Sequence, residues 1–302
     1  MHWRKIAELV KLCNTPASII SPVPILAISL FLIAFKNITI YNIQILFIAI
    51  FFTIISNCAS NLWNHSNDVK EDITQRKKTL LTSDISMQRT GFLIAIFLYA
   101  GSTFLVFYLS SLLNRPIFAF FLIWAFATWW YSDTLILKKV TGFRLKEHYI
   151  GEAITYSIAW PAYILSIWLI FSEMNVNGLI IAMAFVFLSI SGLLLKDMKD
   201  ISGDRKVGLK TFGVIFLPSQ LIRFSCYFMI LFYFVILNPF SFMYLGMGLF
   251  LLVFPFLYFL KKTFFHMQLK NWKLDISDTK AIKILGYSGY ISVISLGLSS
   301  FI

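Results

Sequence analysis

The chain contains a series of apolar stretches that are too long and too continuous for the core of a soluble protein. Hydrophobic residues make up 59% of its 302 residues, whereas charged residues make up only 13%. A helix needs about 20 mainly apolar residues to cross the hydrocarbon core of a bilayer, and a helix satisfies its own backbone hydrogen bonds there. The expected spans are residues 17–35, 43–62, 92–112, 117–137, 153–171, 179–195, 214–237, 242–260 and 284–301. The sequence therefore predicts an all-α fold, a polytopic membrane helical bundle of about nine transmembrane helices.

The net charge of +12 is explained by how the basic residues are distributed between the loops. If successive spans alternate in direction, one side of the membrane receives the N-terminus and nearly all of the 26 Lys and Arg residues. The exceptions are Lys36 and Arg115, on the other side, and Arg223, within or at the edge of the seventh span. Basic loops face the cytoplasm in multi-pass proteins. We therefore expect an integral membrane protein with a cytoplasmic N-terminus, a lipid bilayer as its surroundings and no nucleic-acid partner.

The first residues of the chain have the pattern of a short amphipathic helix. Apolar side chains such as Trp3, Ile6 and Leu9 alternate with charged ones at helical spacing over residues 1–14. Such a helix lies in the plane of the membrane interface with its apolar face inward. We expect this interfacial helix to precede a single transmembrane domain that spans residues 15–302.

Two acidic clusters stand out because the apolar chain has only 14 Asp and Glu residues. Each cluster follows an apolar span, the second and the sixth, so both fall on the basic, cytoplasmic side. The first consists of Asn64, Asp68 and Asp72, and the second of Asp197, Asp200 and Asp204. Spacings of three and four residues place the members of each cluster on one face of a helix. Carboxylates in such a row repel one another unless a cation lies between them, and oxygen ligands favour Mg²⁺ or Ca²⁺.

Basic residues follow both acidic clusters. After the first come Arg76, Lys77 and Lys78, and after the second comes a loop that begins with Arg205 and Lys206. A third polar patch on the same side contains Tyr131, Ser132, Lys138, Lys139 and Arg144. Carboxylates that hold cations, next to Lys and Arg that neutralise the remaining charge, suit a metal-bridged polyanion.

These motifs resemble those of the UbiA superfamily of intramembrane prenyltransferases. The Asn64, Asp68 and Asp72 spacing is similar to that family's NxxxDxxxD motif, and Asp200 with Asp204 is similar to its DxxxD motif. The run KDMKDISGDRKVGLKT is close to the family's KDxxDxxGDxxxGxxT, and motifs after the second and sixth of nine helices fit its plan. The family's Arg-Pro-Leu-x-Ser-Gly run is absent from the chain.

The resemblance implies a helical bundle around a central cavity and a role for each cluster. It implies an Mg²⁺-dependent enzyme, with two ions, that transfers a polyprenyl group from a polyprenyl diphosphate to an aromatic or other lipid acceptor and releases diphosphate. The implied metal ligands are Asn64, Asp68, Asp72, Asp197, Asp200 and Asp204, of which Asp68, Asp72, Asp200 and Asp204 are catalytic. The implied diphosphate contacts are Arg76, Lys77, Tyr131, Lys138, Lys139 and Arg205, with the choice between neighbouring basic residues left open.

Three other classes of membrane protein compete with this interpretation. A CDP-alcohol phosphotransferase also uses Mg²⁺ and aspartates, but its DGxxAR run is absent. A cation-coupled transporter places acidic groups near the middle of the bilayer, often at broken helices, whereas these clusters lie at span ends. A terpene cyclase of the same superfamily has the same metal clusters and stays open as an alternative. The resemblance leaves the acceptor and the prenyl chain length undetermined.

Overall fold

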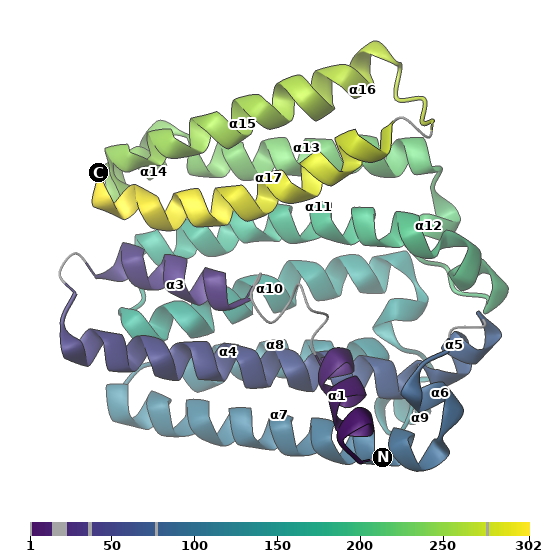
Figure 1. The fold of residues 1–302 in the computed structure, drawn as a ribbon. Helices are drawn as coiled ribbons and strands as arrows, with labels where there is room; N and C mark the ends of the chain where they lie inside the picture. Colours follow the sequence, from purple (N-terminus) through teal and green to yellow (C-terminus); the bar gives the residue numbers. More distant parts are fainter. Residues whose placement is uncertain (1, 14–22, 36–37, 76–77, 276–277) are drawn as a thin grey trace.

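In the computed structural model of the protein, the secondary-structure elements of the described residues are all helices, joined by turns and loops. The structure describes residues 2–13, 23–35, 38–75, 78–275 and 278–302. Figure 1 shows long helices that run side by side, with their connections gathered at the two ends. The elements are α1 (His2–Cys13), α3 (Val23–Ala34), α4 (Ile40–Asn67), α5 (Val69–Thr74), α6 (Leu80–Ser83), α7 (Ile85–Leu113), α8 (Ile117–Ser132), α9 (Leu137–Thr141), η1 (Leu145–Glu147), α10 (Tyr149–Phe171), α11 (Val176–Lys206), α12 (Phe212–Ile215), α13 (Pro218–Ile236), α14 (Pro239–Leu245), η2 (Met247–Leu252), α15 (Val253–Phe259), η3 (Leu260–Phe264), α16 (Phe265–Leu269), α17 (Thr279–Leu298) and η5 (Ser299–Phe301).

The predicted membrane bundle is confirmed. Among the described residues, seven stretches of helix are long and apolar enough to cross a bilayer, and α3 and α8 are shorter apolar helices. Each overlaps one of the nine expected spans. The protein is thus a multi-pass integral membrane protein with an all-α fold.

The fourth span ends earlier than the sequence predicts, at Ser132 instead of residue 137. The next residue, Asp133, is fully buried, and its carboxylate accepts hydrogen bonds from the backbone N–H groups of Leu135 at 3.2 Å and Ile136 at 2.9 Å. A side chain that binds nearby N–H groups offers the backbone an alternative to helical bonds. The chain therefore turns at Asp133 before α9 begins.

The eighth span is broken instead of forming one helix over residues 242–260. Gly246 has a φ of 95°, in a region that non-glycine residues avoid, and α14 ends there. The chain continues through η2, α15, the π-helical turn η3 and α16. Gly248 packs so closely that a Cβ atom would stand 1.8 Å from the carbonyl oxygen of Ser299. The break therefore lets the chain approach the C-terminal turn.

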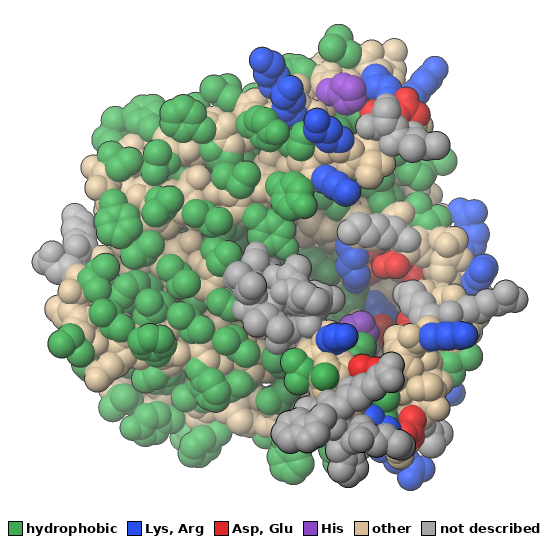
Figure 2. Space-filling view, viewed as in Figure 1, with side chains coloured by type: hydrophobic (Ala, Val, Ile, Leu, Met, Phe, Trp, Pro, Cys, Tyr) green, Lys and Arg blue, Asp and Glu red, His purple; other side chains and the backbone are tan. Residues whose placement is uncertain are grey.

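Charged side chains collect at one end of the bundle. In Figure 2 apolar side chains cover most of the visible face, while Lys, Arg, Asp and Glu gather at the right, over the ends of α4, α11 and α16. We call this the charged end. The predicted N-terminal helix forms as α1 beside it and packs against α4 and α6, and Lys5 on α1 forms an ion pair of 3.0 Å with Asp84. Its position at a membrane interface stays a prediction.

Candidate active site

The two acidic clusters line one cavity at the charged end, which has a volume of about 180 Å³. All six predicted metal ligands contribute to its wall. We call this cavity the acidic pocket. Its described lining consists of Asn64, His65, Asp68, Glu71, Asp72, Gln75, Tyr131, Lys146, Glu152, Lys196, Asp197, Asp200, Asp204, Leu209 and Thr211.

The first cluster spans a break between two helices. The sequence predicts one continuous helical row, but α4 ends at Asn67 and α5 begins at Val69, with Asp68 between them. The backbone N–H of Asp68 still donates to the carbonyl of Asn64 at 3.0 Å, and that of Asp72 donates to the carbonyl of Asp68 at 2.8 Å. These bonds preserve the four-residue spacing across the break. All three side chains consequently face the acidic pocket.

The second cluster lies on α11, which continues past its apolar part to Lys206. Thr211, in the loop that follows, donates a hydrogen bond of 2.9 Å from its hydroxyl to Asp204. Gly203, next to Asp204, leaves room for the side chain of Gln75, because a Cβ atom would stand 2.4 Å from that amide carbon. The α5 segment of the first cluster therefore packs directly on the helix that carries the second.

Two buried cations from the segment between α9 and α10 bind the carboxylates of Asp68 and Glu71. Lys146 lines the acidic pocket, whereas Arg144 is not among its described wall residues. Lys146, on η1 and only 6% exposed, donates to Asp68 and, at 2.8 Å, to Glu71. Arg144, only 4% exposed, binds Glu71 through its guanidinium and Glu147 at 2.9 Å. In the sequence Lys146 counts only as loop charge, and Arg144 only as a member of the third polar patch. Nothing in their spacing indicates that they reach a motif more than seventy residues earlier.

This network sets the charge of the first cluster. Burial raises the pKa of Asp68 to about 6, although Lys146 acts in the opposite direction. Burial also disfavours the charged form of Glu71, but Lys146 and Arg144 outweigh it and lower the pKa of Glu71. In the second cluster, burial and the neighbouring Asp200 raise the pKa of Asp204 against the effect of its hydrogen bond from Thr211. The pocket thus concentrates negative charge that only partial counter-charge balances.

A further carboxylate, Glu152 at the start of α10, connects three elements around the pocket. It is 2% exposed and accepts hydrogen bonds from the Tyr131 hydroxyl at 3.0 Å and from the Phe212 backbone N–H at 3.4 Å. The ammonium of Lys196 donates to the Tyr131 oxygen at 3.3 Å. Sequence reasoning missed Glu152 and Lys196 as site residues. The one local signal is that Lys196 directly precedes Asp197.

The residues predicted to contact diphosphate do not all line the acidic pocket, unlike the predicted metal ligands. Tyr131 lines the acidic pocket. Lys138 does not line it and pairs with Glu147 at 2.5 Å, while Lys139 and Arg205 are exposed outside the wall. Arg76 and Lys77 lie outside the described residues. The Lys side chains that the described wall contains are Lys146 and Lys196.

Comparison with known proteins decides the family. The model of the UbiA prenyltransferase family matches residues 22–281. The chain belongs to the UbiA prenyltransferase family. This UbiA-family protein is 30% identical to an uncharacterized protein of Archaeoglobus fulgidus. The alignment covers 97% of this chain and 99% of the relative.

Two solved structures share the fold of this UbiA-family protein. A UbiA homolog from Archaeoglobus fulgidus bound to GPP and Mg²⁺ superposes with a TM-score of 0.63 at 17% identity, and covers 97% of this chain and 99% of that one. A UbiA homolog from the same organism bound to Cd²⁺ has a TM-score of 0.59 at 15% identity, and covers 98% and 100%.

The side-chain oxygen atoms of this UbiA-family site are of the kind that Mg²⁺ prefers. The carboxylate atom Asp197 Oδ2 is buried without a hydrogen-bond partner among the described residues, so it retains a free acceptor. No three His, Cys, Asp or Glu side chains in the described part of the chain are arranged to hold an ion alone. Mg²⁺ is usually bound by one or two carboxylates together with water and substrate phosphates. The arrangement therefore fits an ion whose coordination a phosphate ligand completes.

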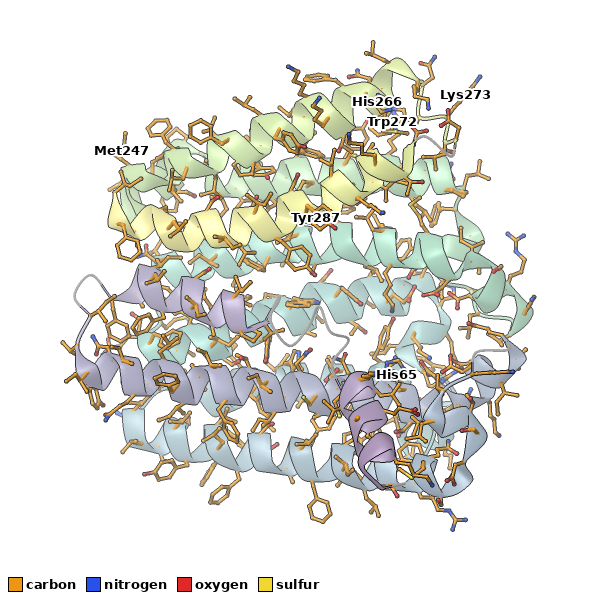
Figure 3. All side chains as sticks on the ribbon, viewed as in Figure 1. His65, Met247, His266, Trp272, Lys273 and Tyr287 are labelled. Carbon is orange, nitrogen blue, oxygen red and sulfur yellow. The ribbon has the colours of Figure 1, made fainter. Side chains whose placement is uncertain are left out.

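Two further cavities adjoin the acidic pocket within the bundle. One, of about 360 Å³ between α4, α8 and α10, shares Asn64, His65, Tyr131 and Lys196 with the acidic pocket, and we call it the amide chamber. The other, of about 400 Å³ between α3, α10, α11 and α17, is mainly apolar, and we call it the apolar cavity. Lys196 lines all three cavities. Figure 3 marks His65 on α4, close to α1 in that view.

Proposed function

We propose that this protein is an Mg²⁺-dependent prenyltransferase that moves a polyprenyl group from a polyprenyl diphosphate to an aromatic or other lipid acceptor. The observation that carries the proposal is that both acidic clusters and two lysines face one pocket, which adjoins an apolar cavity. A diphosphate needs the first environment and a prenyl chain needs the second. A homolog with the same fold binds GPP and Mg²⁺, which supports the same donor class here.

Each part of the pocket has a defined task in this proposal. Mg²⁺, when bound by Asn64, Asp68, Asp72, Asp197, Asp200 and Asp204, supplies positive charge that stabilises the departing diphosphate. Lys146 and Lys196 are placed to contact the diphosphate oxygens, because both line the pocket. The C1–O bond of the donor breaks, its electron pair leaves with the diphosphate, and the acceptor bonds to C1 and loses a proton.

The rings next to Lys196 suit the carbocation character that C1 acquires. Tyr156 and Trp160 line both the apolar cavity and the amide chamber. Aromatic faces stabilise a nearby cation and exclude the water that would quench it. The site faces the cytoplasm in this proposal, because the charged end carries most of the basic residues.

Purified protein in detergent provides the test. Geranyl diphosphate with a panel of acceptors should yield a prenylated product and diphosphate only when Mg²⁺ is present. Asp68→Asn and Asp200→Asn should each reduce diphosphate release by about 100-fold or more while the protein elutes as folded material. Glu173→Gln is the matched control, because Glu173 is exposed in the loop between α10 and α11.

Product mass spectrometry distinguishes the proposal from its alternatives. A hydrocarbon or terpene alcohol formed from the prenyl diphosphate alone would identify a cyclase. Full turnover in either aspartate variant would rule out the two-cluster mechanism.

A further inference from the structure

A group of exposed lysines lies where the last two apolar stretches of the chain meet the charged end. Lys261 and Lys262 belong to the π-helical turn η3, and Lys280 and Lys283 lie near the start of α17. All four side chains are exposed. Figure 2 shows a row of basic side chains that crosses from the end of α15 to α17 on the visible face. We call these four residues the lysine patch.

A buried hydrogen bond holds the two halves of the lysine patch together. Thr263, which follows Lys262, is fully buried and donates from its hydroxyl to the backbone carbonyl of Ala281 at 3.0 Å. Ala281, which follows Lys280, is only 5% exposed. The bond joins η3 to α17 although 18 residues separate its two ends along the chain. The lysines on either side of it therefore rise from one packed surface.

The lysine patch has no counter-charge among the described residues. None of its four lysines forms an ion pair or a hydrogen bond with another side chain that the structure describes. The carboxylates nearest in sequence are already paired. Asp275 binds Lys270 at 2.6 Å, and Asp278 binds Lys270 at 2.7 Å and His266 at 3.0 Å. Because like charges repel one another, an anion at the patch would relieve a repulsion that these residues leave unbalanced.

The outer faces of the same helices are apolar next to the lysine patch. Leu257 and Tyr258 on α15 are 56% and 48% exposed, and Tyr287 and Ile291 on α17 are 61% and 45% exposed. Figure 3 marks Tyr287 on the outer side of α17. Tyr287 follows Lys283 by four residues, about one helical turn deeper in the bundle. Tyrosine side chains gather at the level of the lipid headgroups in membrane proteins. Cations, tyrosines and apolar side chains thus succeed one another along this surface.

We propose that the lysine patch binds the headgroup of an anionic phospholipid, whose acyl chains lie along the outer faces of α15 and α17. A phosphate with two acyl chains matches both the unpaired cations and the apolar surface beside them. In the orientation proposed above, the patch faces the cytoplasmic leaflet, whose anionic lipids attract basic segments next to membrane spans. The positive-inside rule counts charges in loops and does not require that lysines from two helices converge.

Native mass spectrometry of the purified protein in neutral detergent tests the proposal, with EDTA present to remove divalent ions. The probes are dioleoyl phosphatidylglycerol and dioleoyl phosphatidylcholine, which have the same acyl chains. The wild type should bind phosphatidylglycerol at least about tenfold more tightly. A lysine near anionic lipid contributes about fivefold in affinity. Lys261→Gln/Lys262→Gln and Lys280→Gln/Lys283→Gln should therefore each weaken phosphatidylglycerol binding by about 10- to 25-fold and leave phosphatidylcholine binding unchanged.

The double variant Lys206→Gln/Lys210→Gln is the matched control, because it removes two exposed lysines at the charged end outside the lysine patch. It should bind phosphatidylglycerol like the wild type. Phosphatidylglycerol should also raise the melting temperature of the wild type and of the control by more degrees than that of either patch variant.

Four outcomes would overturn the proposal. The first is equal affinity of the wild type for the two lipids, and the second is an equal loss of phosphatidylglycerol binding in the control and the patch variants. The third is binding of glycerol phosphate as tight as that of phosphatidylglycerol, which would assign the lysine patch to a free phosphate compound. The fourth is tighter binding of polyglutamate, which would assign it to an acidic protein.

Discussion

At the scale of single residues, the candidate site combines side chains whose regular spacing is visible in the sequence with others that the sequence does not indicate. The aspartates repeat at helical spacing in an apolar chain, so their spacing alone indicates a common purpose. Lys146 has no such signature, yet it is buried and binds both Asp68 and Glu71. In the described structure its ammonium group neutralises carboxylates that would otherwise repel one another. We therefore expect it to compete with any cation that binds the first cluster.

Lys146→Ala tests this competition. Removal of one partner from a buried ion pair leaves uncompensated charge, so the variant should lose about 3 kcal/mol of stability in the absence of metal. Mg²⁺ should raise the melting temperature of the variant by more degrees than it raises that of the wild type. Thermal unfolding in detergent with and without Mg²⁺ measures both effects. Lys139→Ala, which changes an exposed lysine near η1, should show neither. Equal Mg²⁺ stabilisation of variant and wild type would contradict the competition.

At the scale of helices, a close backbone contact joins α11, which carries the second acidic cluster, to the short helix α12. α12 packs on α11 at Gly213, where a Cβ atom would stand 2.4 Å from the carbonyl oxygen of Asp197 and 3.0 Å from the side chain of Ile201. Thr211, just before α12, donates to Asp204. The glycine thus fixes the distance between a supporting helix and the second acidic cluster. Neither its neighbours in sequence nor its φ angle indicates this role.

Gly213→Ala should separate α12 from α11 and disturb the Thr211 contact. Overpacking of this kind costs about 1–3 kcal/mol, and we expect a lower melting temperature together with slower diphosphate release. Gly101→Ala on α7 is the matched control, because a Cβ atom there meets nothing within 4 Å. That substitution should be neutral or stabilising by up to about 1 kcal/mol. The same effect in both variants would show that helix propensity, and not the α11 contact, is responsible.

The interactions of Asp278, between α16 and α17, should make the stability of the protein depend on pH. Burial of Asp278 disfavours its charged form, but Lys270 at 2.7 Å, the N–H of Asp275 at 2.8 Å and His266 at 3.0 Å outweigh it and lower its pKa. Figure 3 shows His266 near Trp272 in this region. A carboxyl whose pKa is lower in the folded state stabilises the fold above its unfolded pKa of about 3.9. That stabilisation is lost as the pH falls through the folded value.

Asp278→Asn removes this contribution. The variant should melt below the wild type at neutral pH, and the difference should narrow as the pH falls below about 4. Melting curves in detergent across this range give the comparison. A difference that does not change with pH would assign the loss to packing instead of charge.

At the scale of the whole molecule, the bundle divides its chemistry along its length. The acidic pocket lies at the charged end, and the amide chamber and the apolar cavity extend from it between the spans. A donor with an anionic head and an apolar tail fits this division. A transporter with carboxylates at the middle of its spans would have a different distribution of charge.

The orientation of the bundle can be measured directly. In a variant whose Cys13, Cys58 and Cys226 are replaced by serine, a single new cysteine can be placed at either end of the bundle. Glu173→Cys lies in the loop between α10 and α11, and Lys273→Cys lies between α16 and α17 at the charged end. Both positions are exposed, so a thiol reagent can reach them. The positive-inside rule predicts that an impermeant maleimide labels Glu173→Cys in intact cells and reaches Lys273→Cys only after lysis. The reverse pattern would place the acidic pocket outside the cytoplasm.

The sequence by itself determined the membrane bundle, the acidic clusters and the family, because span length, helical spacing and motif order are local properties of the chain. Hydropathy placed the end of the fourth span too late, because the carboxylate of Asp133 binds nearby backbone N–H groups and competes with the helix. The sequence did not show the break at Gly246, since the close contact of Gly248 with Ser299 joins segments that are distant along the chain. Only the tertiary structure decided that Lys146, Glu152 and Lys196 surround the acidic pocket, and that asparagines on α4 face hydroxyl groups on α8 and α10. These groups meet because helices distant in sequence pack together, and pairing across such distances leaves no periodic signal in the chain.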